Sequence, residues 1–227
     1  MAGVLFATSA ETSGGTDLRA GRRLDLTQLI GQQERAVAAQ DERLAELQAQ
    51  VQDLQDRAGA GDVEVAAAQA AADALAGGVG LTAVQGPGLT VSLDDAPPAE
   101  DGILPVGARA NDVVVHQSDV QAVVNAMWAG GAEAMTLMGE RIIATSAVRC
   151  VGNTLLLHGR TYSPPFVVTA IGDADRMRAE LDASAYVGLF REAVAAFGLG
   201  YDVDDLDEVT LPSFDGPLGV TVATESE

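Results

Sequence analysis

The chain has 227 residues, of which 33 are acidic and 13 are basic, and its formal net charge is −20. A surface this acidic repels phosphate backbones and anionic lipid head groups, so nucleic-acid binding is disfavoured. The hydrophobic fraction of 48% is enough to build a folded core. The single cysteine rules out an internal disulfide and a cysteine-rich metal site.

The first ten residues, MAGVLFATSA, are apolar and carry no charged side chain. They are too few to cross a bilayer, which takes about 20 residues, and no basic region precedes them as in a signal peptide. Two interpretations stay open from the residues alone: a disordered N-terminus, or the outer end of a transmembrane helix that begins upstream. Residues 11–23 are polar, and we expect residues 1–23 to be a membrane-proximal remnant followed by a linker.

Residues 24–58 predict a coiled-coil stalk, because they contain no proline and one glycine and their apolar residues recur every seven positions. Position a holds Ile30, Val37, Leu44, Val51 and Ala58, and position d holds Leu26, Gln33, Gln40, Leu47 and Leu54. β-Branched residues at a and leucine at d favour a parallel dimer. The alternative is a single amphipathic helix that folds back on its own domain. We expect a homodimer formed through Ile30, Val37, Leu44, Leu47, Val51 and Leu54.

Residues 63–212 predict a globular domain, followed by a flexible tail over 213–227. We expect first a helix over 63–75, then strands over 81–85 and 89–93 around a turn at Gly86-Pro87-Gly88, and a loop over 96–112. Next comes a helix that is capped by Ser118 and Gln121 and ends at Gly130-Gly131, followed by a strand over 132–138 and several short strands between 147 and 171. The last elements are helices over 173–198, split near Ser184, and a strand within 201–211. This order predicts an α+β fold with helices on one face of a mainly antiparallel sheet, similar to ferredoxin-like domains.

Cysteine and histidine come close together in the stretch RCVGNTLLLHGR, residues 149–160. Gly152-Asn153 lies between two apolar runs, which is typical of a two-residue hairpin turn. That turn pairs Cys150 with Leu155 and leaves His158, at the start of a second tight turn, two or three pairs away. We therefore expect Cys150 to be a small buried hydrophobic residue and not a nucleophile.

The other polar clusters do not complete a catalytic or metal site. His116 and His158 are the two histidines of the chain, and a zinc site needs further ligands. The acidic run YDVDDLDEV, residues 201–209, lacks the glycine and the spacing of a calcium loop, so it predicts a solvated loop. We expect no enzymatic activity, no catalytic residue, no metal and no cofactor.

Three arginines are the candidate binding residues of this acidic chain. Gathered on one face, Arg141, Arg149 and Arg160 would form a site for an anionic ligand or partner.

Three motifs, in this order, resemble the bacterial domain of unknown function 881, the YlxW-like family. They are GPGLTVSLDDAP (86–97), SDVQAVVNAMWAGGAEAMTLMGERI (118–142) and TSAVRCVGNTLLLHGRTYSPPFVVTAIGD (145–173). The resemblance covers residues 25–212. It implies a membrane-anchored bacterial protein with one transmembrane helix, a coiled coil and then a globular domain outside the cytoplasm. It also implies an accessory role near cell division or cell-wall assembly, and it supplies no catalytic residues.

These observations lead to two functional hypotheses. The first is a non-enzymatic, single-pass membrane protein of the cell envelope that acts by protein–protein interaction, through coiled-coil avidity and an exposed sheet edge or groove. Its partners would be other envelope or division proteins. The alternative is a sensor module in which the loop 96–112 and the three arginines bind an anionic envelope metabolite.

Overall fold

The computed structural model describes residues 18–98 and 104–216. The chain divides into two compact units, Met1–Ala71 and Ala72–Glu227. The predictions for residues 1–17, including the membrane-proximal remnant, lie outside the described residues, and so does most of the predicted tail. Among the helices that are described, none combines the length and the apolar character that a bilayer span requires.

The predicted stalk lies within one long helix. Helix α2 (Leu18–Gly61) is 44 residues long and covers the whole of residues 24–58. It ends where Gly61 and Asp62 interrupt the pattern, and helix α3 (Val63–Ala76) follows. The Asp62 carboxylate accepts a hydrogen bond from the backbone N–H of Glu64 at 2.8 Å, which caps the start of α3.

Five antiparallel strands form the main sheet, in the order β3-β2-β7-β1-β8. Their bounds are β1 (Val84–Asp94), β2 (Ala134–Leu137), β3 (Glu140–Ile142), β7 (Phe166–Ile171) and β8 (Gly200–Leu211). Helical segments connect β1 to β2 and β7 to β8, and in each case one strand lies between the two connected strands. This is the split βαβ arrangement of ferredoxin-like domains. The predicted α+β fold is confirmed.

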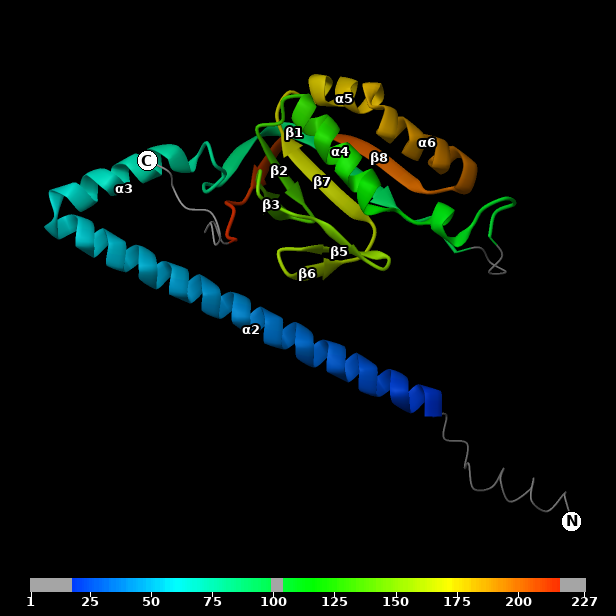
Figure 1. Cartoon of the computed structure of the whole chain (residues 1–227), viewed down its shortest axis with the longest axis horizontal. Helices are drawn as coiled ribbons and strands as arrows, with labels where there is room; N and C mark the ends of the chain where they lie inside the picture. Colours follow the sequence, from blue (N-terminus) through cyan, green and yellow to red (C-terminus); the bar gives the residue numbers. More distant parts are fainter. Residues whose placement is uncertain (1–17, 99–103, 217–227) are drawn as a thin grey trace, which may run out of the picture. The chain divides into compact units, whose positions relative to one another are not determined.

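The helices of this domain lie against one face of the sheet (Figure 1). They are α4 (Gln117–Ala129), α5 (Ala174–Ala183) and α6 (Ala185–Phe197), and a short 3₁₀ helix, η1 (Ala110–Val113), precedes them. The side chains of Asp173 and Ser184 accept hydrogen bonds from the backbone N–H groups of Arg176 and Val187, which starts α5 and α6. The predicted break near Ser184 is therefore confirmed.

The capping box predicted at Ser118 and Gln121 is wrong by two residues. Helix α4 begins at Gln117, and the Asp119 carboxylate accepts a hydrogen bond from the His116 N–H at 2.8 Å. An aspartate in the first turn satisfies a free N–H and also lies favourably in the field of the helix N-terminus.

The core lies between the sheet and these helices. Alternate residues of β1 point toward the helices, and Leu89, Val91 and Leu93 are fully buried. They belong to one apolar cluster with buried side chains of all three helices, which include Val123, Met127, Met177, Leu181, Val187 and Phe190.

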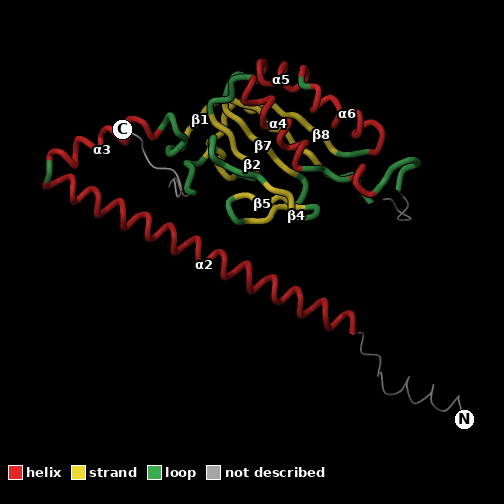
Figure 2. The backbone as a smooth tube through the Cα atoms, viewed as in Figure 1, coloured by secondary structure: helices red, strands yellow, loops and turns green. Residues whose placement is uncertain are grey.

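A second sheet of three short strands lies beside the main one (Figure 2). It consists of β4 (Arg149–Val151), β5 (Thr154–Leu157) and β6 (Arg160–Tyr162). Cys150 lies opposite Leu155, which confirms the predicted hairpin at Gly152-Asn153. Leu155 and Leu157 are buried in the main core and join the two sheets.

The structure corrects the prediction for the Gly86-Pro87-Gly88 segment. It is not a turn between two strands but a register shift within the continuous strand β1. A Cβ atom at Gly88 would lie 1.9 Å from the carbonyl oxygen of Ala170 on β7. Gly88 is therefore required because β1 and β7 approach each other closely at this position. In the sequence, a glycine of this kind cannot be distinguished from a glycine in a turn.

Three further predictions are corrected. The strand expected within 201–211 is confirmed as β8, but the interpretation of the acidic run 201–209 as a solvated loop is wrong, because the run belongs to the strand that pairs with β1. Cys150 is exposed and not buried, because β4 is a short edge strand. The domain also continues past residue 212: Phe214 is 8% exposed, and its N–H donates to the carbonyl of Gly80 at 2.8 Å.

Replacing Gly88 by alanine will destabilise the domain by about 2 kcal/mol or more, because the new methyl group overlaps the Ala170 carbonyl. The matched control is Gly188→Ala in α6, where nothing lies within 4 Å of the added Cβ. That change will stabilise by about 0.5–1 kcal/mol. Urea unfolding measures both. Equal effects of the two substitutions would contradict the packing assigned to β1 and β7.

Candidate functional site

The three candidate arginines lie in different environments. Arg141 on β3 is 5% exposed, and its Nη1 donates to the carbonyl oxygens of Thr82 at 3.3 Å and Pro212 at 2.9 Å. Burial lowers the pKa of its guanidinium, and its Nε has no hydrogen-bond partner among the described residues. Arg141 therefore holds backbone together and is not available to a ligand.

The other two arginines are exposed and lie in the small sheet. Arg149 lies opposite Leu156, whereas Arg160 lies opposite the adjacent residue Leu157. Adjacent residues of a strand point to opposite faces, so the two arginines lie on opposite faces of this sheet. The structure thus does not bring Arg141, Arg149 and Arg160 into one patch.

Two turns of the same type carry the main polar cluster. Met138-Gly139 connects β2 to β3, and His158-Gly159 connects β5 to β6. All four residues have positive φ, between 50° and 83°, which is the conformation of a type I′ hairpin turn. Each turn is preceded by a buried leucine and followed by a charged residue, Glu140 in one case and Arg160 in the other.

Those two charged residues join the turns. The Arg160 Nη1 lies 2.8 Å from the Glu140 Oε1, and the Tyr162 hydroxyl donates to the same oxygen at 2.8 Å. Burial, followed by the hydrogen bond to Glu140 and its negative charge, raises the pKa of Tyr162 to about 12. Glu140 is therefore a carboxylate with two donors, and it fastens the small sheet to the edge of the main sheet.

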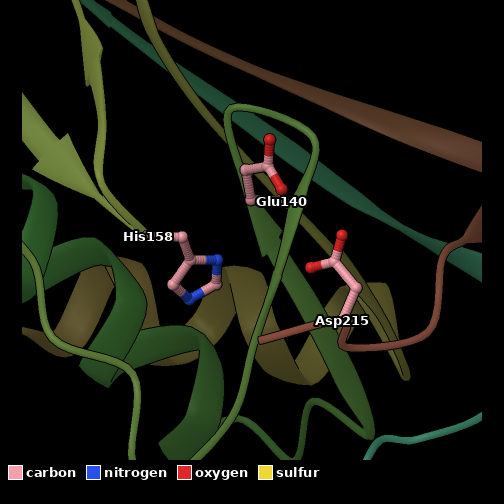
Figure 3. Close-up of side chains that lie close together, drawn as sticks. All are labelled: Glu140, His158 and Asp215. Atoms are coloured by element: carbon pink, nitrogen blue, oxygen red, sulfur yellow. The ribbon is translucent and has the colours of Figure 1, made fainter. Parts of the chain in front are cut away.

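His158 lies beside this ion pair. Its Nε2 is 3.3 Å from the Ser146 hydroxyl, and its ring meets the Phe214 ring edge to face with centroids 5.2 Å apart. Figure 3 shows the carboxylates of Glu140 and Asp215 on the same side of the imidazole. The His158 main chain has a φ of 50°, so the tight turn fixes the direction in which the ring leaves the chain.

Glu140, His158 and Asp215 also carry the ligand types of a metal site. One ligand atom each from Glu140, His158 and Asp215 lies within 4.8 Å of the others. A divalent ion there would compete with the guanidinium of Arg160 and the hydroxyl of Tyr162 for Glu140. The positive charge at the centre of the cluster is thus supplied by the chain itself, and we interpret the cluster as an ion-pair brace.

A groove of about 240 Å³ adjoins the cluster and lies between α4 and the segment that follows β3. Its helical wall presents Gln121, Asn125 and Trp128, which lie on one face of α4 because they are four and three residues apart. Its other residues are mostly apolar: Val120, Val124, Ile142, Ile143, Ala144, Ser146 and Val148. Ser146 belongs both to this groove and to the contact with His158.

The groove has the composition of a small docking site. Trp128 is 39% exposed, although the α4 residue before it, Met127, is fully buried. Gln121 donates to Asn125 at 2.9 Å, which leaves further donors and acceptors of both amides for an occupant. Apolar side chains together with a few polar groups are typical of sites that bind one side chain of a partner.

Residues 71–224 match the family described as bacterial protein of unknown function (DUF881). The match covers more than half of the chain. The chain belongs to the DUF881 family. The family resemblance of the three sequence motifs is thereby confirmed.

Named relatives of this DUF881 chain come from two bacterial genera. The UPF0749 protein Rv1823 of Mycobacterium tuberculosis (strain ATCC 25618 / H37Rv) is 29% identical over 216 residues, which are 94% of this chain and 70% of that protein. The UPF0749 protein YlxW of Bacillus subtilis (strain 168) is 36% identical over 97 residues, which are 43% of this chain and 40% of that protein.

A solved structure shares the fold. It is the crystal structure of an uncharacterized conserved protein from Mycobacterium tuberculosis, with a TM-score of 0.50 and 23% sequence identity. The alignment covers 68% of this chain and 98% of that one. The likeness supports the fold and carries no information on a ligand.

Sequence reasoning missed the brace and the groove. A usable signal for the brace was the repetition of leucine, a residue, glycine and a charged residue at 137–140 and 157–160, with opposite charges in the two copies. The groove had no such signal, because its two walls are about 20 residues apart in the chain and look like ordinary core residues.

Replacing Glu140 by glutamine will lower the pKa of Tyr162 from about 12 toward its ordinary value. The pKa of Tyr162 will fall only part of the way, because burial of its side chain is the largest cause of the raised pKa and is not removed by this substitution. Near-ultraviolet absorbance of tyrosinate during an alkaline titration measures the change, and Tyr162→Phe identifies the component that belongs to this residue. The titration of Tyr201 is the internal control, and a Tyr162 curve that does not move would show that Glu140 is not its partner.

Proposed function

We propose that this protein is a non-enzymatic interaction protein that self-associates through α2 and docks a partner on its α+β domain. The observation that carries the proposal is a row of exposed large apolar side chains on α2. Leu44 is 49% exposed and Leu47 is 43% exposed, and Val51 and Leu54 continue the row. These residues occupy the a and d positions of the predicted heptads.

The rest of the helix surface fits association of this kind. Charges of both signs flank the row and pair along the helix: Arg43 with Glu46, and Arg57 with Asp53 at 2.7 Å. An isolated helix with this row exposes apolar area to water, and pairing with a second copy removes it. Gln33 and Gln40 at two d positions restrict the register of the pair. Val37 is half-buried, and the side chain of Ile30 lies outside the described residues.

The stalk is tested by replacing Leu47 and Leu54 together with glutamine. Sedimentation velocity will show the parent chain as a dimer. The double variant will associate at least about a hundredfold more weakly, because the dimer no longer buries four leucine side chains. The matched control is Ala45→Gln with Ala49→Gln, at exposed positions outside the row, which will leave the dimer intact. A parent chain that stays monomeric at its highest soluble concentration would disprove the stalk.

The groove between α4 and residues 142–148 is the proposed docking site of the domain. Its apolar lining residues and the exposed ring of Trp128 suit an aliphatic or aromatic side chain of a partner protein. Dimerisation through α2 doubles the number of grooves, so two weak contacts with one partner assembly add up by avidity.

The groove is tested with dansyl amide, a neutral apolar probe that accepts energy from tryptophan. Trp128 is the only tryptophan of the chain, so energy transfer reports binding near it. Val148→Asp places a charge in the groove and will weaken binding by at least about tenfold. Val151→Asp is the matched control, because Val151 is exposed on β4 and does not line the groove. Equal binding by both variants would show that the probe and the groove are unrelated.

Anchorage to the cell membrane, with the domain facing out of the cytoplasm, and an accessory role near cell division or cell-wall assembly belong to the same proposal. They are supported by the apolar run MAGVLFATSA and by what the family resemblance implies, and not by a described helix. Fractionation of the native gene product tests the anchorage: extraction with high salt alone would contradict it.

A sensor for an anionic envelope metabolite is the second candidate function. The observation in its favour is Arg149, which is exposed, carries no ion pair with a described residue and directly follows the groove residue Val148. A thermal shift with nucleotide-linked cell-wall precursors that Arg149→Ala abolishes would favour this function over docking of a protein.

A further inference from the structure

The outer edge of strand β8 is the longest open edge of the main sheet. Strand β8 is 12 residues long and pairs with β1, and the strand order ends with it. Within residues 18–98 and 104–216 no other strand pairs with its second edge. Alternate backbone N–H and C=O groups of β8 therefore point outward, where an added strand can bind them.

The side chains along this edge carry charge of one sign. Five of the 12 residues are acidic, all five are exposed, and no basic residue occurs among them: Asp202, Asp204, Asp205, Asp207 and Glu208. Asp205 pairs with Arg178 of α5 at 2.7 Å. The other four have no ion pair with a described residue.

The register places two of the unpaired carboxylates on the sheet face that the helices leave open. Asp202 lies opposite Ser92, and Asp204 lies opposite Thr90. Thr90 in turn lies opposite Thr169 of β7, with their hydroxyl oxygens 3.1 Å apart. This face is therefore polar next to β8, and its two carboxylates repeat at every second residue.

Edge strands commonly carry charge to prevent aggregation, and that accounts for part of the pattern. Charge of a single sign does more than mixed charge. Two copies of β8 placed edge to edge repel each other. The edge also repels an anionic partner, whereas it attracts a strand with positive charges. The edge is closed to a second copy and open to a basic strand.

We propose that the outer edge of β8 binds an extended basic segment of a partner protein as an added strand, whose arginines or lysines at alternate positions lie opposite Asp202 and Asp204. Backbone hydrogen bonds hold the segment, and its alternate basic side chains give the specificity. The partner chemistry follows from charge complementarity, because opposite charges directly across two strands attract. This surface is distinct from the groove and does not require dimerisation through α2.

Binding is measured by fluorescence anisotropy of the full-length chain with labelled synthetic peptides as long as β8. The first peptide alternates arginine and threonine. The second has the same composition with its arginines in one block. The third repeats the alternating sequence but carries N-methyl groups on the amides of one edge. The alternating peptide will bind more tightly than the other two, and its affinity will fall as salt is added.

The decisive variant is Asp202→Asn with Asp204→Asn, which removes charge from exposed positions of the open face. It will weaken binding of the alternating peptide by about fivefold to tenfold. The matched control is Glu180→Gln with Glu192→Gln, which removes two exposed charges from α5 and α6 and will leave binding unchanged.

Four results would overturn the proposal. Equal weakening by the control variant would assign the binding to the general acidity of the chain. Equal binding of the N-methylated peptide would exclude strand addition, and equal binding of the block peptide would exclude the alternating register. Absence of binding by all three peptides would also overturn it. None of these results depends on the stalk or on the groove.

Discussion

The buried guanidinium of Arg141 is the contact on which the α+β domain depends. It links Thr82, where the chain enters the sheet, to Pro212, where the chain leaves it. The backbone bond from Phe214 to Gly80 makes a second link between the same two segments. A buried charge without a carboxylate partner is costly, and carbonyl oxygens are here its compensation. Loss of this side chain would leave both ends of the domain without their common partner.

The polar cluster follows from that closure. The segment fixed at Pro212 carries Phe214 onto the ring of His158, and the turn of His158 leads directly into Arg160. Arg160 then meets Glu140, the residue before Arg141 on β3. Adjacent residues of a strand point to opposite faces. Arg141 of β3 therefore contacts the two ends of the domain, and Glu140 contacts the sheet of β4, β5 and β6. The groove wall begins at Ile142, directly after these two residues.

The parts that could be predicted from the sequence are those that local chemistry determines. Gly152-Asn153 gave the hairpin and Ser184 gave the helix break, because a turn and a cap each depend on a few neighbouring residues. The turn predicted at Gly88 was wrong, because a glycine needed for contact with another strand cannot be distinguished in the sequence from a glycine in a turn. Burial of Arg141 and exposure of Cys150 were equally hidden, since both depend on which strand ends the sheet and on what covers it.

The sign of the charges separates the two kinds of contact proposed for this acidic chain. On α2, arginines and carboxylates pair with each other along the helix, so they do not oppose a second copy at the apolar row. On β8 four carboxylates have no ion pair with any residue in the described part of the chain, so the strand repels its own copy. The charges therefore leave the proposed self-association at α2 unopposed, whereas they oppose self-association at the sheet edge, although the net charge of the whole chain is the same in both contacts. The two proposed contacts, a dimer through α2 and a partner strand at β8, can coexist on one chain only with this division of charge.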